Sequence, residues 1–138
     1  MINIIISSDQ RYSINKEQIK DSAISALQKN GVSSGNVEIG ISIVGDRKMH
    51  DLNLKYKGID ATTDILTFAL EDPNPTPMQN VPKVGFVKSP DKVLRLGDIV
   101  ISYPQSVEDA GLDGISVDEE IRLLVIHGVD HLLDIHHN

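Results

Sequence analysis

The residues best suited to chemistry in this sequence are histidines close to its C-terminus. Four of the five histidines fall within the last twelve residues, and His127, His131 and His137 have the spacing H-x3-H-x5-H. If the segment leading into them is helical, His127 and His131 lie one turn apart on the same face and can share a metal ion. A third histidine arriving after a turn completes a three-nitrogen set with an open position for water. The spacing therefore predicts a catalytic metal centre.

The residue after the first histidine limits the reactions that such a centre can perform. Zinc peptidases of the H-E-x-x-H type have a glutamate there as general base, whereas this chain has Gly128. A peptidase is therefore the weaker interpretation, although another carboxylate or a metal-bound hydroxide can act as the base. Gly128 also suits a place where a helix packs closely against its neighbours. A single histidine is ordinarily a surface or core residue, and His136 to Asn138 can be a frayed tail, so the argument depends on all three histidines together.

The segment before the histidines has the pattern of a capped, amphipathic helix. Ser116 and Glu119 have the spacing of a capping box, which starts a helix. Residues that can face a core then recur at helical intervals: Ile121, Leu124, Val125, Gly128 and Leu132. We therefore expect one helix to carry both His127 and His131.

The rest of the chain alternates between strand and helix patterns. Four segments are expected to form strands: Ile2–Ile6, Val37–Val44, Ile65–Leu70 and Leu96–Ser102. Further helices are expected from Ser13 or Asn15 to Asn30-Gly31, after Gly45-Asp46, and near Pro104 to Ala110. The stretch from Glu71 to Lys92 holds five of the six prolines and predicts a loop, with at most a short strand at Val84–Val87. The predicted fold is α+β, a small mixed four-stranded sheet packed with helices, with a zincin-like metal-binding helix near the C-terminus.

Composition and charge narrow the classes of protein to consider. The 138 residues predict a single domain, residues 1–138, and the absence of cysteine leaves His, Asp and Glu as metal ligands. No signal peptide or membrane span is visible, so a cytoplasmic protein without a membrane partner is expected. The net charge of −7 argues mildly against nucleic acid. The cluster of Arg47, Lys48, Lys55 and Lys57 is, on charge alone, the solvated face of a helix.

Three motifs, in order and spacing, resemble the YbeY family of metal-dependent endoribonucleases, the rRNA maturation factors. Leu52 to Phe68 resembles the pattern L-N-x-x-Y-R-x-x-D-x-P-T-D-V-L-S-F, and Leu96 to Ser102 matches L-G-D-I-V-I-S without a change. His127 to His137 resembles H-G-x-L-H-L-x-G-Y-D-H. The resemblance spans the chain and implies a metal-dependent hydrolase-like domain that acts on RNA, with ribosomal proteins as further partners and no dinucleotide cofactor.

The resemblance also implies roles for individual residues. His127, His131 and His137 match the three metal ligands, with Zn2+ as the usual ion. Lys57 stands where the family generally has an arginine associated with phosphate contact and activity, and lysine keeps the charge but not the bidentate fork. Asp134 stands where the family has a glycine and where the chain is expected to leave the helix. The third ligand is therefore expected to be less well fixed, with His136 as a conceivable substitute.

The sequence supports two possible functions, one enzymatic and one non-catalytic. The leading one is a metal-dependent single-strand endoribonuclease in rRNA processing and ribosome maturation, with the metal activating water and Lys57 assisting at the phosphate. Asp98 and Asp64 are candidate bases or supports for the metal ligands, and Asp64 more readily explains a cap or an ordered turn. The alternative is a non-catalytic ribosome-assembly or interaction protein with a structural or vestigial metal site. The sequence leaves the RNA substrate, the native metal and the oligomeric state open.

Overall fold

The computed structural model of the protein describes residues 2–32, 35–70 and 93–137, with side chains as far as Asp134. The proline-rich stretch 71–92, expected to be a loop, lies outside the described residues. In chain order the described elements are β1 (Ile2–Ser8), α1 (Lys16–Lys29), β2 (Val37–Val44), α2 (Asp46–Lys57), β3 (Ile65–Ala69), β4 (Leu94–Ser102), α4 (Tyr103–Asp113) and α5 (Val117–His137).

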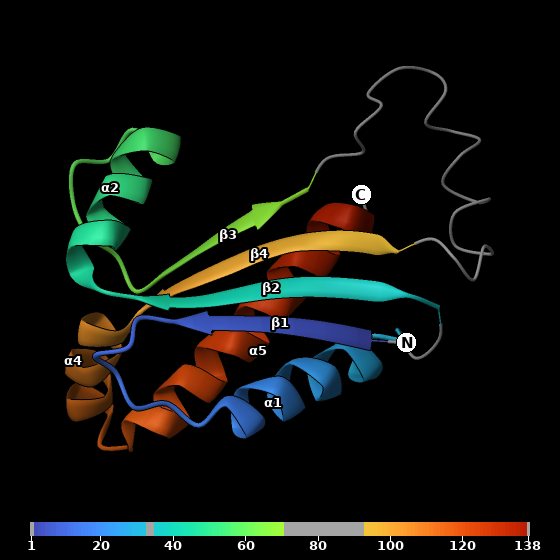
Figure 1. The fold of residues 1–138 in the computed structure, drawn as a ribbon, viewed down its shortest axis with the longest axis horizontal. Helices are drawn as coiled ribbons and strands as arrows, with labels where there is room; N and C mark the ends of the chain where they lie inside the picture. Colours follow the sequence, from blue (N-terminus) through green and yellow to red (C-terminus); the bar gives the residue numbers. More distant parts are fainter. Residues whose placement is uncertain (1, 33–34, 71–92, 138) are drawn as a thin grey trace.

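The four strands form one mixed sheet in the order β1-β2-β4-β3 (Figure 1). β1 and β2 are parallel, as are β2 and β4, whereas β3 runs antiparallel to β4. The predicted α+β fold and its four strand segments are confirmed. β4 is an inner strand, and between Leu96 and Ser102 only Asp98 is not fully buried. This burial is what the apolar run of β4 predicted.

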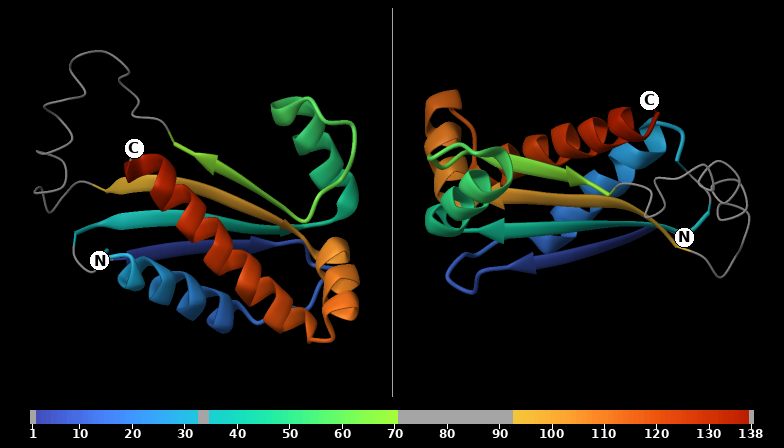
Figure 2. Two further views of the ribbon diagram at one scale, coloured as in Figure 1. Left: turned by 180° about the vertical axis from the view of Figure 1, so that it is seen from behind. Right: turned by 90° about the horizontal axis from the view of Figure 1, so that it is seen from above.

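Two helices cover one face of the sheet, and a third packs on the other. α1 and α5 lie side by side on the same face (Figure 2). The alternating side chains Ile39, Ile41 and Ile43 of β2 point into the core that these helices close. On the opposite face, Met49 of α2 packs against Leu66 and Val100. No helix within the described residues is long and apolar enough to span a membrane.

The position of α5 on the sheet follows from its first turn and from one glycine. The Ser116 hydroxyl accepts a hydrogen bond from the Glu119 amide at 3.0 Å, as the capping box predicts. The Glu119 carboxylate instead pairs with Arg122, so the reciprocal half of the box is absent. At Gly128, an added Cβ would lie 2.9 Å from Cδ1 of Ile99. Glycine therefore lets α5 approach β4 closely, the second of the two roles considered for this residue.

Candidate active site

His127 and His131 are both in α5 and both exposed to solvent. Because they are four residues apart in a continuous helix, they lie on the same side of it, as predicted. Neither ring has a hydrogen-bond or ion-pair partner within the described part of the chain, so their nitrogen lone pairs are not committed elsewhere. Burial against apolar side chains would have removed the metal interpretation, and it is not observed. The two rings thus form an available pair of imidazole ligands.

His131 lies on the side of α5 that faces away from α1, and His127 lies between it and the side that carries Asp130. Asp130 marks the other flank, because its carboxylate accepts a hydrogen bond from Asn30, at the end of α1, at 2.9 Å. Successive helical residues are about 100° apart, so His131 lies on the opposite side of the buried face from Asp130. That side leads toward β3, the last described strand at this end of the sheet. The candidate site is therefore at the β3 side of the molecule.

The last turn of α5 differs from the expected course of the chain. The chain was expected to leave the helix near Asp134, but α5 continues to His137. Asp134 lacks the freedom of the family's glycine to adopt a left-handed conformation, and no described non-glycine residue has a positive φ. A continuous helix puts His137 about 9 Å further along the axis than His131. The described side chains include two of the three predicted ligands, His127 and His131.

No group of three potential ligands converges on one point among the described residues. The His137 side chain lies outside that description, as does that of His136, the substitute considered for it. The predicted three-histidine centre therefore stays a prediction.

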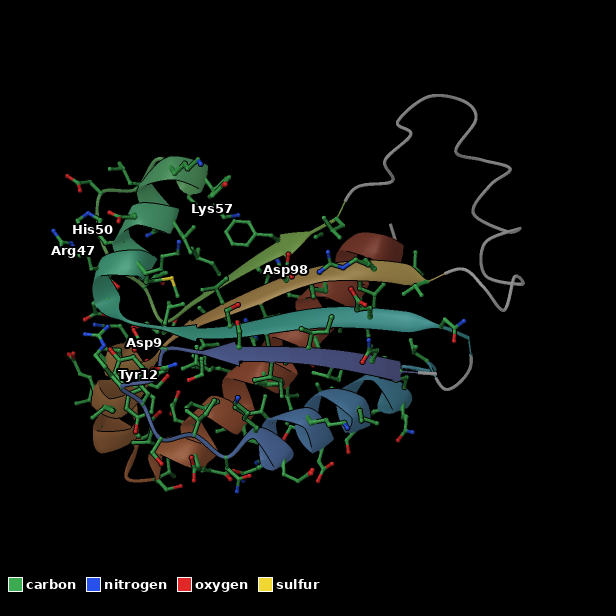
Figure 3. The ribbon with its side chains drawn as sticks, in the orientation of Figure 1. Asp9, Tyr12, Arg47, His50, Lys57 and Asp98 are labelled. Atoms are coloured by element: carbon green, nitrogen blue, oxygen red, sulfur yellow. The ribbon has the colours of Figure 1, made fainter. Side chains whose placement is uncertain are left out.

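Lys57 is the last residue of α2 and is exposed. Gly58 follows in a left-handed conformation, with φ of 72°, which ends the helix. The Lys57 ammonium lies 5.8 Å from the centre of the Phe68 ring in β3. Figure 3 shows Lys57 at the end of α2, directed toward β3. Phe68 belongs to the apolar cluster beneath α2, so Lys57 lies against the face of β3 opposite to the one that α5 covers, and its contact with phosphate remains a prediction.

The two aspartates considered as bases are held in other interactions. Asp98 receives a hydrogen bond from Arg95 at 3.2 Å. Its neighbour Ile99 faces α5, so the Asp98 side chain is on the opposite face of the sheet. Asp64 precedes β3, and its carboxylate lies close to those of Asp109 and Glu120 near the start of α5. Neither observation supports a role beside the histidines.

Sequence reasoning missed an acidic cluster at the start of α5. Glu120 is 7% exposed, and its Oε1 has no hydrogen-bond partner in the described residues. Burial first, and then the carboxylates of Asp113, Asp109 and Asp64, raise the pKa of Glu120. Burial and the charge of Asp64 likewise raise the pKa of Asp109. These residues come from three separate segments, so no local sequence pattern could have revealed the cluster.

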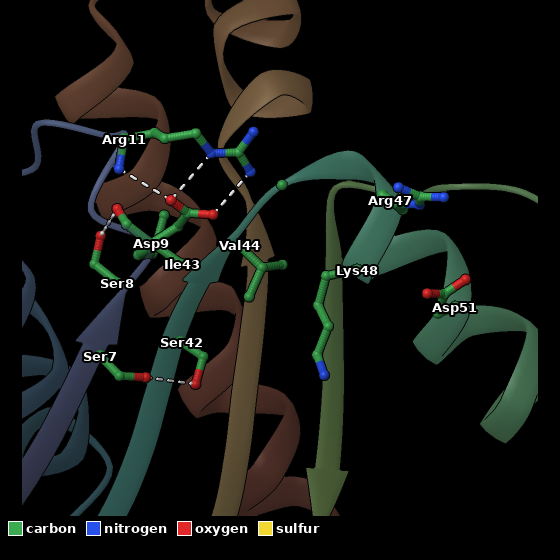
Figure 4. Close-up of a pocket in the computed structure, with 11 residues that line it drawn as sticks. Ser7, Ser8, Asp9, Arg11, Ser42, Ile43, Val44, Arg47, Lys48 and Asp51 are labelled. Atoms are coloured by element: carbon green, nitrogen blue, oxygen red, sulfur yellow. Dashed lines mark hydrogen bonds and ion pairs between the residues drawn. The ribbon is translucent and has the colours of Figure 1, made fainter.

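A second candidate region is a pocket of about 580 Å3 at the carboxyl ends of β1 and β2 and the start of α2 (Figure 4). Arg11, Arg47 and Lys48 contribute positive charge to its lining. Asp9 is already paired with Arg11 at 2.8 Å, and hydrogen bonds from Arg11 lower the pKa of Asp9 to about 2. The pocket is lined by none of His127, His131 and Lys57, so it is separate from the predicted site.

Comparison with known proteins decides the family. The family model described as endoribonuclease YbeY matches residues 4–138. The chain belongs to the endoribonuclease YbeY family. It is 38% identical over 138 residues to the endoribonuclease YbeY of Dehalococcoides mccartyi, covering 99% of this chain and 78% of that protein. It is also 39% identical over 113 residues to the Moorella thermoacetica endoribonuclease YbeY, covering 82% of this chain and 67% of that protein.

The fold of this YbeY family member is shared with a protein of known structure. A Thermotoga maritima protein studied in solution matches with a TM-score of 0.55 at 20% sequence identity. The match covers 94% of this chain and 71% of that one. At this identity the match shows the fold alone.

Proposed function

We propose that this protein is a metal-dependent single-strand endoribonuclease that acts in ribosomal RNA processing and ribosome maturation. Membership of the endoribonuclease YbeY family supports the class of enzyme, a hydrolase that acts on RNA. The observation that carries the proposal is the pair His127 and His131, which is exposed, has no partner among the described residues, and lies one turn apart on α5. The same proposal takes ribosomal RNA as the substrate, ribosomal proteins as further partners, and the cytoplasm as the location.

In this proposal the chain supplies metal ligands on one element and a phosphate contact on another. His127 and His131 hold the ion as neutral imidazoles, with His137 as third ligand when the last turn of α5 opens. The proposed ion is Zn2+, which when bound activates water and stabilises negative charge on a phosphate. Lys57 contacts a neighbouring phosphate as a point charge, because lysine lacks the fork of arginine.

The test combines metal analysis of the purified protein with cleavage of single-stranded RNA. We expect the wild-type protein to retain one metal ion and to cut RNA, and His131→Ala to lose both properties. His50→Ala is the matched control, because His50 lies on α2 and pairs with Asp60 at 2.5 Å. Cleavage by His131→Ala at the wild-type rate would contradict the proposed centre.

A separate pair of variants tests the role of Lys57. Lys57→Ala should weaken RNA cleavage by about tenfold or more without changing metal content, since a charge-assisted bond contributes about 1.5–3 kcal/mol. Lys57→Arg should preserve or raise activity. An alanine variant that cleaves RNA normally would remove Lys57 from the site.

One observation favours the second candidate function, a non-catalytic ribosome-assembly or interaction protein with a vestigial metal site. α5 continues to His137, about 9 Å along the helix axis beyond His131, whereas the expected ligand set needs a turn before the third histidine. Metal-loaded wild-type protein that binds RNA and never cuts it would decide for this alternative.

A further inference from the structure

The chain has only five aromatic residues, three tyrosines and two phenylalanines, and four of them form two very different pairs. Tyr12 and Tyr103 are stacked nearly parallel, with ring centres 4.5 Å apart. The Arg11 guanidinium lies 5.2 Å from the Tyr12 ring centre, and both tyrosines of this pair are partly buried. Tyr56 and Phe68 meet edge to face at 5.3 Å. Only the second pair is exposed enough to receive a ligand, because Tyr56 is 55% exposed.

The second pair combines a fixed ring with an accessible one. Phe68 is half-buried and packs against the cluster of Met49, Leu66 and Val100 beneath α2. Tyr56 extends over it from the last turn of α2 and buries less than half of its own surface. An exposed tyrosine contributes little to the core, so packing accounts for Phe68 but not for Tyr56.

Two lysines lie against the same rings. The Lys55 ammonium is 5.1 Å from the Tyr56 ring centre, and the Lys57 ammonium is 5.8 Å from the Phe68 ring centre. Neither lysine has an ion-pair partner in the described part of the chain. Aromatic faces interleaved with unpaired cations are the combination that binds single-stranded nucleic acid, because the rings stack on bases and the cations contact phosphates. In a chain of net charge −7, such a site must be local.

We propose that Tyr56 and Phe68 form a stacking platform for one unpaired base of the RNA, with Lys55 and Lys57 contacting the adjoining phosphates. The inference rests on the proposed endoribonuclease function and adds a base-binding site to it. β3, which carries Phe68, also packs against α5 through Ile65 and Ala69. Phe68 points to the opposite face of β3 from Ile65 and Ala69, so a base on the platform is held across this strand from the histidine pair. Tyr56 acts here as a positioning residue for the strand to be cut.

The proposal is tested by binding, measured by fluorescence anisotropy with a short unstructured RNA and the same RNA carrying abasic positions. Tyr56→Leu should bind the intact RNA roughly tenfold more weakly, within the range known for loss of one stacked base. Tyr56→Phe keeps the ring and should bind like wild type. Abasic RNA should bind wild type more weakly than intact RNA does, and Tyr56→Leu should no longer distinguish the two.

Salt dependence separates stacking from phosphate contact. Lys55→Ala should reduce the slope of log affinity against log salt by about 1, whereas Tyr56→Leu should leave that slope unchanged. Lys20→Ala is the matched control, an exposed lysine on α1. Equal affinities of wild type and Tyr56→Leu for intact RNA would overturn the platform, as would failure of the wild type to bind RNA. Tighter binding of an oligoglutamate peptide than of RNA would assign the surface to a protein partner instead.

These experiments can contradict the stacking platform and the proposed nuclease function independently. Wild-type protein that binds RNA and does not cut it overturns the nuclease proposal, while the Tyr56 comparison still decides the platform. Cleavage that is unaffected in Tyr56→Leu, together with unchanged binding, overturns the platform alone.

Discussion

The two ends of α5 place ionisable side chains in opposite environments. At the N-terminal end, Glu120 is buried among other carboxylates and has an oxygen without a partner. Toward the C-terminal end, His127 and His131 are exposed and free of partners among the described residues. The carboxylate cluster at the first end forms only where three segments meet. The histidine pair depends only on a spacing of four residues along one helix. A local sequence pattern is therefore enough to predict a pair of metal ligands. It is not enough to predict a buried carboxyl group.

The largest effect is expected from moving the histidine-bearing helix away from the sheet. Gly128→Ala adds a Cβ that meets Cδ1 of Ile99 at 2.9 Å and its other side-chain carbons at 3.1 and 3.2 Å. Overpacking exceeds the gain in helix propensity, so we expect a net loss of about 1–2 kcal/mol. Chemical denaturation measures this loss, and adding Ile99→Val should recover part of it.

Gly111→Ala is the matched control for Gly128→Ala. Gly111 is an exposed glycine in α4, and an added Cβ there meets nothing within 4 Å. The same substitution should stabilise the protein by about 0.5–1 kcal/mol, because glycine in a helix interior is less favourable than alanine. A Gly128→Ala protein as stable as Gly111→Ala would show that α5 does not require the close approach.

A smaller effect is expected near the C-terminal end of α5, beyond His127 and His131. Asp134→Gly restores the residue at which the family's chain leaves the helix, and should allow His137 to approach the other two histidines. We expect Zn2+ affinity, measured by competition with a chelator, to rise about tenfold. Asp134→Ala removes the same carboxylate but favours the helix, so its affinity should not rise. Equal gains in both variants would point to the lost charge and not to the helix end.

The smallest effect is expected at the acidic end of α5 and depends on pH. Because the folded-state pKa of Glu120 is raised, the stability linked to this group is complete below its ordinary pKa and is lost as the pH rises through the folded-state pKa. Glu120→Gln should therefore stabilise the protein by about 1 kcal/mol at neutral pH and have little effect in acid. Thermal unfolding across a pH series measures the difference.

Glu119 is the neighbouring control with the opposite sign. A hydrogen bond from Arg122 lowers the pKa of Glu119, so its contribution is present above its ordinary pKa and is lost as the pH falls through the folded-state pKa. Glu119→Gln should be neutral or slightly destabilising at neutral pH, because the pair is partly exposed to solvent and solvent weakens its attraction. If both variants shift stability in the same direction, burial among carboxylates does not destabilise the charged form of Glu120.

The sequence by itself determined the elements and the histidine pair, because both depend on contacts between residues close in the chain. Alternation of apolar residues predicted β2, and the Ser116 cap together with helical spacing predicted α5 with His127 and His131 on one side of it. These patterns repeat with the period of the backbone itself, so they can be recognised without knowing the fold.

Which of these elements meet depends on the tertiary fold. The strand order β1-β2-β4-β3 brings β3 between α2 and α5, and so places Lys57 and Tyr56 against Phe68. The folding of α4 and α5 against the end of β3 gathers the carboxylates around Glu120. The continuation of α5 past Asp134 also departs from the pattern of the motif. Contacts between distant segments depend on the balance of burial and charge across the whole fold, which no spacing within one segment records.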